Sequence, residues 1–230
     1  MAPLNRFEIS GSELIEANEE VALRFEKIGW GKFFKSFDGH HVEVTKLFAM
    51  NLKDDIVQIG GFEFVINEDK IAAVTQLPQV GERWFKGSKV NKKRCLSLLL
   101  PLPDDTKLKI GVPVRFLKPE WRAYYEILVR YVSCDGRFSH LHLYHLRLLL
   151  ALQGCKINLS LYLWQSLKKM SQDVKSFNNL DRSLFHHGLI KIIVQHQLSV
   201  NGKSWDSFLT DCQLGPTQYW PNPSPRIRKK

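Results

Sequence analysis

The chain has 230 residues and a mass of 26.7 kDa, with 44% hydrophobic and 24% charged residues. This composition is that of an ordinary globular protein, and it excludes a disordered, collagen-like or disulfide-scaffold class. No apolar run approaches the roughly 20 residues that a membrane-spanning helix needs, and the first ten residues lack the pattern of a signal peptide. We therefore expect an intracellular protein with no membrane partner.

The charge is distributed unevenly along the chain. Residues 1–90 carry 11 basic and 14 acidic side chains, whereas residues 91–230 carry 22 and 9. A positive electrostatic field attracts phosphates and releases their counterions, so this asymmetry favours a polyanionic partner such as DNA or RNA. A basic surface that only keeps the protein soluble would explain the same charges.

The first predicted elements are two helices. Ser10 and Glu13 have the spacing of a capping box, and the apolar stripe that follows runs to Ile28 and ends at Gly29. After an aromatic, turn-rich stretch, apolar residues at helical spacing predict a second helix over residues 44–51.

A β-hairpin is predicted next, near residues 56–66. Gly60 and Gly61 separate two runs rich in β-branched and aromatic residues, and a Gly-Gly pair tolerates the positive φ that a tight hairpin turn requires. Asn67 can then cap a short helix, which Pro78 must end because proline restricts the residue before it.

Periodicity fades between Gln79 and Pro119, and only residues 95–100 form a short apolar segment there. We interpret this stretch as an irregular bridge between two lobes, residues 1–88 and 118–198, within a single domain of residues 1–214. Prolines and basic residues dominate residues 215–230, which predicts an extended basic tail.

Four helices are predicted after the bridge. Pro119 suits the first helical position of one, and Ser139 can cap a second over residues 140–153. Asn158 and Asp181 can cap the third and fourth. The predicted fold class is therefore mainly α (α+β), a helical domain with one β-hairpin and a C-terminal four-helix region.

Catalytic and metal-binding patterns are weak or missing. His140, His142 and His145 follow Cys134, but residues two apart face away from each other on a helix, and a hydrogen-bonded core position suits His145 better than a metal site. No serine elbow, phosphate-binding loop or C-x-x-C pair occurs, so we expect no enzyme activity, no cofactor and no metal.

Basic clusters are the remaining candidate sites. The candidate nucleic-acid-binding residues are Lys89, Lys92, Lys93, Arg94, Lys168, Lys169, Arg226, Arg228, Lys229 and Lys230. A short run of lysine and arginine such as the last four is typical of phosphate binding or of a nuclear address, which favours the nucleus over the cytoplasm.

From Phe33 to Leu198 the chain resembles the transposon protein domain of plants, a family found in open reading frames around plant retroelements. The ordered matches that carry this resemblance are Ile28-Gly29-Trp30, Val57-x-Ile59-x-Gly61-x-x-Phe64, Leu77-Pro78, Gly154-x-x-Ile157-Asn158 and His187-Gly188-Leu189-Ile190. The chain is similar, more loosely, to plant mobile-domain proteins. The resemblance implies a mobile-element origin and a mainly helical fold, and it supplies no catalytic residues.

Two functions remain open. The first is a non-enzymatic, nucleic-acid-associated accessory protein that contacts phosphates without reading sequence. The second is a protein-interaction or assembly module, with the hairpin and its following helix as the docking surface. Clustering of the basic residues of 92–94 and 168–169 on one face would favour the first function, and scattered charges would favour the second.

Overall fold

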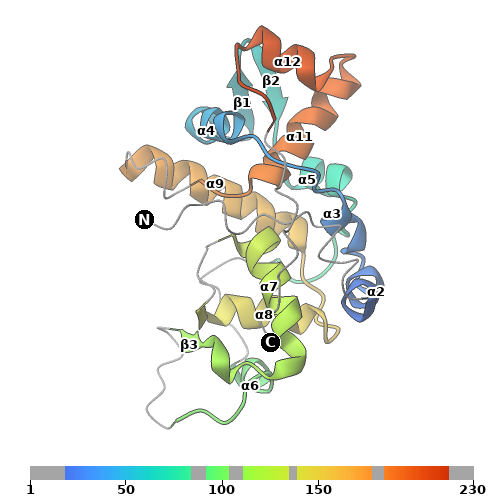
Figure 1. Ribbon diagram of the computed structural model, residues 1–230, viewed down its shortest axis with the longest axis vertical. Coiled ribbons are helices and arrows are strands. Elements are labelled where there is room, and N and C mark those ends of the chain that lie inside the picture. Colours follow the sequence, from blue (N-terminus) through green and yellow to red (C-terminus); the bar gives the residue numbers. More distant parts are fainter. Residues whose placement is uncertain (1–18, 84–91, 104–110, 135–138, 178–183, 218–230) are drawn as a thin grey trace, which may run out of the picture.

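The computed structural model describes residues 19–83, 92–103, 111–134, 139–177 and 184–217, and Figure 1 shows their arrangement. The fold is mainly helical with two small antiparallel two-stranded sheets, which confirms the predicted mainly α (α+β) class. In this described part, every helix is too short or too polar to cross a membrane.

The first described elements are three helices, and the first two contribute Phe25 and Phe34 to a cluster of aromatic rings, with ring centroids 4.5 Å apart. The helices are α2 (Glu19–Lys27), α3 (Gly31–Lys35) and α4 (Val42–Asn51). The predicted end of the first helix is confirmed: Gly29 has a φ of 79°, and the Trp30 amide donates to the Phe25 carbonyl at 2.9 Å, as in a Schellman cap. The predicted start, at Ser10, lies outside the described residues.

The predicted hairpin and its following helix are both present. They are β1 (Ile56–Ile59), β2 (Phe62–Val65) and α5 (Glu68–Thr75). Ile59 pairs with Phe62 across the Gly-Gly turn, and both glycines have positive φ. The Asn67 side chain accepts a hydrogen bond from the Lys70 amide at 2.9 Å, which confirms it as the helix cap.

The second half begins with short elements. They are α6 (Lys92–Leu96), β3 (Val112–Pro113), the 3₁₀ helices η2 (Val114–Phe116) and η3 (Pro119–Trp121), α7 (Arg122–Leu128), the π-helix η4 (Val129–Ser133) and β4 (His140–Leu141). Longer helices follow: α8 (Leu143–Ala151), α9 (Leu159–Phe177), α11 (His187–Val200) and α12 (Trp205–Asp211).

The helix predicted over residues 140–153 begins later than expected. His140 and Leu141 instead pair with Pro113 and Val112 as a small antiparallel sheet, so the chain enters α8 only at His142, whose backbone is extended. Asn158 caps α9 as predicted. Asp181 lies outside the described residues, and α11 begins after His186, which has a φ of 60°.

One continuous core joins the elements. Helices α4 and α5 pack on α9 and α11, so helices from both predicted lobes share this core. Figure 1 places the hairpin and α12 at one end of the molecule and α6 with β3 at the other. Helix α12, which the sequence pattern did not predict, covers the hairpin, because the Phe208 ring lies 5.4 Å from Phe62 and 5.8 Å from Phe64.

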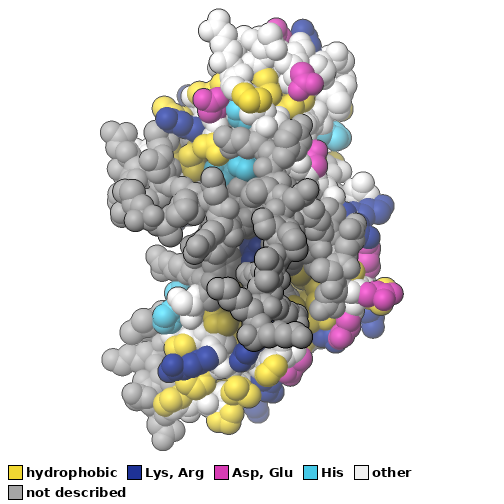
Figure 2. All heavy atoms as spheres, in the orientation of Figure 1, with side chains coloured by type: hydrophobic (Ala, Val, Ile, Leu, Met, Phe, Trp, Pro, Cys, Tyr) yellow, Lys and Arg dark blue, Asp and Glu magenta, His cyan; other side chains and the backbone are white. Residues whose placement is uncertain are grey.

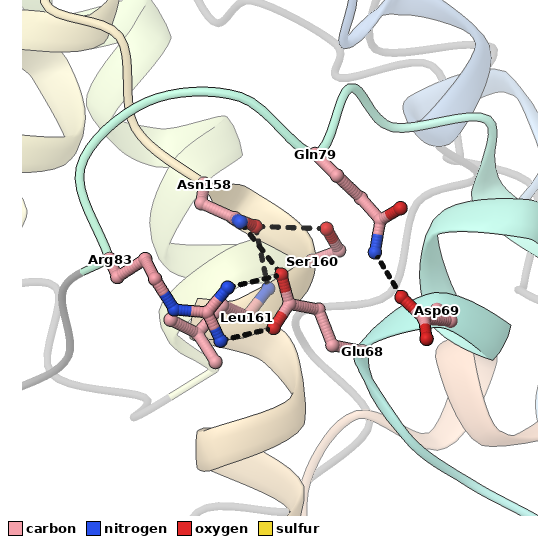
Figure 3. Close-up of polar contacts among 7 residues, drawn as sticks. All are labelled: Glu68, Asp69, Gln79, Arg83, Asn158, Ser160 and Leu161. Atoms are coloured by element: carbon pink, nitrogen blue, oxygen red, sulfur yellow. Dashed lines mark hydrogen bonds and ion pairs between the residues drawn. The ribbon is translucent and has the colours of Figure 1, made fainter.

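A polar joint holds the segment after α5 against the start of α9. Glu82 forms a parallel bridge with Ile157, and Figure 3 shows the side chains around it. The Glu68 carboxylate accepts two hydrogen bonds from Arg83, at 2.8 and 3.2 Å, and one from the Asn158 amide at 2.8 Å. Because Asn158 also caps α9, one network fixes the beginnings of two helices.

Candidate nucleic-acid interface

Helix α6 carries three of the predicted basic residues. Lys93 and Arg94 are exposed on it, and Lys92 is its first residue. Cys95 faces the opposite way and is fully buried, and this burial raises the pKa of its thiol to about 11, with a smaller contribution from Cys155. The helix therefore presents its cations outward because its cysteine is part of the core. Lys89 and residues 226–230 lie outside the described residues.

Lys168 and Lys169, the other predicted basic residues, lie elsewhere in the fold. Lys168 extends over the ring of Trp164, 4.7 Å from its centroid, and lines an open hollow with the acidic residues Glu68 and Asp69. Lys169 forms an ion pair with Asp173 at 2.5 Å. Both belong to α9, which packs on α4 and α5, whereas α6 packs on α8. These two lysines thus lie beside acidic residues and apart from α6. The basic residues of 92–94 and 168–169 therefore do not gather on one face, and a nucleic-acid role has to rest on other cations near α6.

Three further cations join those of α6. The strand-like segment after α6 runs beside residues 114–118: Leu99 bridges to Leu117, and the Lys118 amide donates to the Leu98 carbonyl at 3.1 Å. This pairing brings Arg115, Lys118 and Arg122 to the same end of the molecule as α6. We call the set Lys93, Arg94, Arg115, Lys118 and Arg122 the basic face.

The basic face carries little compensating negative charge. Residues 92–103 and 111–134 contain seven basic and two acidic residues. Among the described ion pairs, none involves Lys93, Arg115, Lys118 or Arg122. These cations are therefore available to an anionic ligand.

Backbone contacts hold several of these side chains in place. The Lys118 ammonium donates to the Ser97 carbonyl at 2.7 Å, the Arg115 guanidinium lies over the Phe116 ring, and Arg122 donates to two backbone carbonyls at 3.4 Å. A cation that is already oriented loses less side-chain entropy when it binds a phosphate.

Figure 2 shows one face of this end of the molecule, where Lys and Arg side chains lie among hydrophobic ones. Leu96 and Leu100 are each 39% exposed beside the basic face. Two exposed leucines therefore border the cations of this surface.

The sequence does hold a signal for the missed cations. Arg115, Lys118 and Arg122 recur at steps of three and four residues, the spacing of one helical face. Arg115 and Lys118 lie in the stretch interpreted as an irregular bridge, whereas Arg122 lies in the helix predicted to begin at Pro119.

Of the histidine candidates, His145 is a hydrogen-bonded core group, whereas His140 is exposed. His145 is 1% exposed, with Nδ1 accepting from the His142 amide at 3.1 Å and Nε2 lying 3.2 Å from the Ser133 hydroxyl, which confirms the predicted core position. In the described part of the chain, no group of three or more His, Cys, Asp or Glu side chains has the geometry of a metal site.

Cys134 lies beside both an imidazole and a backbone carbonyl. Its sulfur is 3.4 Å from Nδ1 of His186, whose Nε2 is 2.9 Å from the Ser166 hydroxyl. The thiol donates to the Arg130 carbonyl at 3.0 Å. The thiol thus has two acceptors within reach, the Arg130 carbonyl and the His186 imidazole.

Comparison of this chain with protein-family models, curated proteins and solved structures yields no match. The resemblance to the transposon protein domain of plants therefore stays a prediction.

Proposed function

We propose that this protein is a non-enzymatic, nucleic-acid-associated accessory protein that binds the phosphate backbone through the basic face. The observation that carries this proposal is the set of five cations on α6 and residues 115–122, in a region with seven basic and two acidic residues. A mobile-element origin and a nuclear location belong to the same proposal, and they are supported by the resemblance and by the basic run at residues 226–230.

Binding of this kind is expected to be independent of base sequence. Reading a base sequence requires an element that enters a groove and presents side chains to base edges. The basic face instead consists of a five-residue helix, α6, and the short turns and helix start between residues 115 and 122, none of which is a long element that could enter a groove. Lysine and arginine in such an arrangement neutralise phosphates and release counterions.

A protein-interaction role is the second candidate. Ile56 and Val65 are cross-strand partners on the hairpin and are 41% and 36% exposed, so they form an apolar pair on one face. The Gln197 amide already bonds both main-chain groups of Val65, at 2.9 Å each, so a partner would contact this face rather than extend the strand edge.

The test compares two variants that lose the same charge. One replaces Lys93, Arg115 and Arg122 by glutamine, and the other replaces the exposed Lys53, Lys70 and Lys203, which lie outside the basic face. Fluorescence anisotropy with labelled single- and double-stranded DNA and RNA, in about 0.1 M salt, measures affinity. Three lost phosphate contacts should weaken duplex binding about 500-fold, because each contributes about 0.9 to the salt exponent and therefore about eightfold at 0.1 M salt.

The control variant should retain the affinity of the unmodified chain. Equal loss in both variants would show that net charge alone governs binding, and no binding by the unmodified chain would exclude the proposal. In the second case the Val65→Glu variant would serve to test the hairpin as a protein-docking surface.

A further inference from the structure

A hollow of about 960 Å³ is lined by residues other than those of the basic face. We call it the aromatic groove. Its walls are the end of α2, the segment Pro78–Val80 and residues 151–157 between α8 and α9, and η3 contributes Trp121. No residue of the basic face lines it, so the two sets of residues can be substituted independently.

The floor of the aromatic groove is apolar. Trp30 is 2% exposed and Trp121 7% exposed, so both indoles are packed into the floor rather than projecting from it. Leu152 and Ile157 are also buried there, while Val80 on the wall is 54% exposed. This combination of a packed aromatic floor and an exposed apolar wall is typical of a preformed ligand site.

The rim of the groove is cationic. Arg24, Lys27 and Lys156 are the charged residues that line it, and no carboxylate does. None of the three forms an ion pair within the part of the chain that the structure describes. The Arg24 guanidinium lies 5.3 Å from the ring centroids of both Trp121 and Tyr124, so cation–π contacts orient it at the edge of the floor.

The groove remains positive after the neighbouring helix dipoles are considered. Helices α2 and α8 both end at it, and each ends in a Schellman cap with Gly29 or Gly154 at positive φ. A helix C-terminus contributes about half a negative charge, so two of them offset about one of the three cations. The remaining positive potential attracts an anion.

We propose that the aromatic groove binds a small organic anion with a flat apolar body and at least one anionic group. The apolar floor would take the body, and Arg24, Lys27 or Lys156 would take the anionic group. The volume lies at the upper end of the range for pockets that bury a drug-sized ligand. Charge complementarity selects an anion over a neutral compound of the same shape.

A pair of fluorescent probes tests the two parts of this proposal. 1-Anilinonaphthalene-8-sulfonate has an aromatic body and one sulfonate, and N-phenyl-1-naphthylamine has the same body without the charge. Titration of the full chain with each probe measures affinity and stoichiometry. The sulfonate should bind at one site, with an affinity at least about tenfold higher than that of the neutral amine. One charge-assisted hydrogen bond supplies this factor.

Variants at exposed positions identify the site. Val80→Glu places a carboxylate on the groove wall and should weaken the sulfonate at least about tenfold, while Val200→Glu, at a valine 72% exposed outside the groove, should not. Lys27→Gln with Lys156→Gln should remove most of the preference for the sulfonate, and Lys53→Gln with Lys203→Gln should preserve it.

Equal affinity of the unmodified chain for the two probes would overturn the proposal. So would binding that Val80→Glu leaves unchanged, because the probe would then occupy another surface. The proposal would also be overturned if the control variants lost as much affinity for the sulfonate, or as much preference for it, as the groove variants.

Discussion

Gly81 is the position where adding one methyl group should lower the free energy of unfolding most. Its φ is +106°, and a Cβ there would lie 2.5 Å from the Lys156 carbonyl oxygen and 2.7 Å from the Ile157 nitrogen. Both atoms belong to backbone held by the parallel bridge, in which the Glu82 amide donates to Lys156 at 2.9 Å. Alanine at this position must therefore push two segments apart.

The cost of Gly81→Ala has two parts. A left-handed backbone costs a residue with a Cβ about 1–2 kcal/mol. Separating the segments also breaks the bond from Glu82 to Lys156 and the bond from the Asn158 amide to Glu82, each contributing about 1 kcal/mol. We expect the free energy of unfolding to fall by about 3–4 kcal/mol.

Gly202→Ala is the matched control, because Gly202 also has a positive φ, +68°, but a Cβ there would meet nothing within 4 Å. This variant should lose only about 1–2 kcal/mol. Urea unfolding of both variants, followed by circular dichroism, measures the difference. Equal losses would refute the idea that close contact at the bridge, rather than backbone conformation, makes glycine necessary at position 81.

Three further predictions concern buried groups. Burial, with a smaller contribution from His40, lowers the pKa of His187 to about 4. The unfolded chain therefore binds the proton first as the pH drops, and the free energy of unfolding should fall between pH 6.5 and pH 4. His187→Leu should flatten this pH dependence, and an unchanged slope would contradict the prediction. Asn158→Ala removes the cap of α9 and the bond to Glu68 and should cost about 2 kcal/mol in urea unfolding, against about 1 kcal/mol for Ser204→Ala at the exposed cap of α12. Cys95 should resist a thiol reagent such as 5,5′-dithiobis(2-nitrobenzoate) at pH 8 until the chain unfolds, because burial raises the pKa of its thiol to about 11. Mass spectrometry locates the labelled cysteines, and rapid labelling of Cys95 in the folded chain would contradict the prediction.

Elements defined by local chemistry could be predicted from the sequence. Asn67 and Asn158 each cap a helix because a short side-chain oxygen reaches amides two or three residues later, whatever the rest of the fold does. The turn at Gly60 and Gly61 is equally local, since only the conformational freedom of those residues is needed.

Elements that depend on contacts between distant residues could not be predicted from the sequence. His140 and Leu141 have the composition of a helix start, and they become a strand because Val112 and Pro113 lie beside them. Helix α12 is a different case: Ser204 caps it and Phe208 with Leu209 form its buried side, so a usable local signal was present.

The candidate sites depend on such distant contacts. Nothing in the sequence around Arg115 indicates that it lies beside α6, because the bridge between Leu99 and Leu117 makes them neighbours. The aromatic groove likewise requires Trp30 and Trp121, which are far apart in the chain, to share one floor. Composition predicted a basic second half, and the fold determines which of its cations meet.

The salt dependence of nucleic-acid binding tests the central proposal most directly. The measurement is the slope of log affinity against log salt for a DNA duplex, with the unmodified chain and the two triple glutamine variants. Removing Lys93, Arg115 and Arg122 should reduce the magnitude of the slope by about 2–3, because each lost phosphate contact removes about 0.9. Removing Lys53, Lys70 and Lys203 should leave the slope unchanged. A slope that is the same in both variants would show that the basic face makes no phosphate contacts.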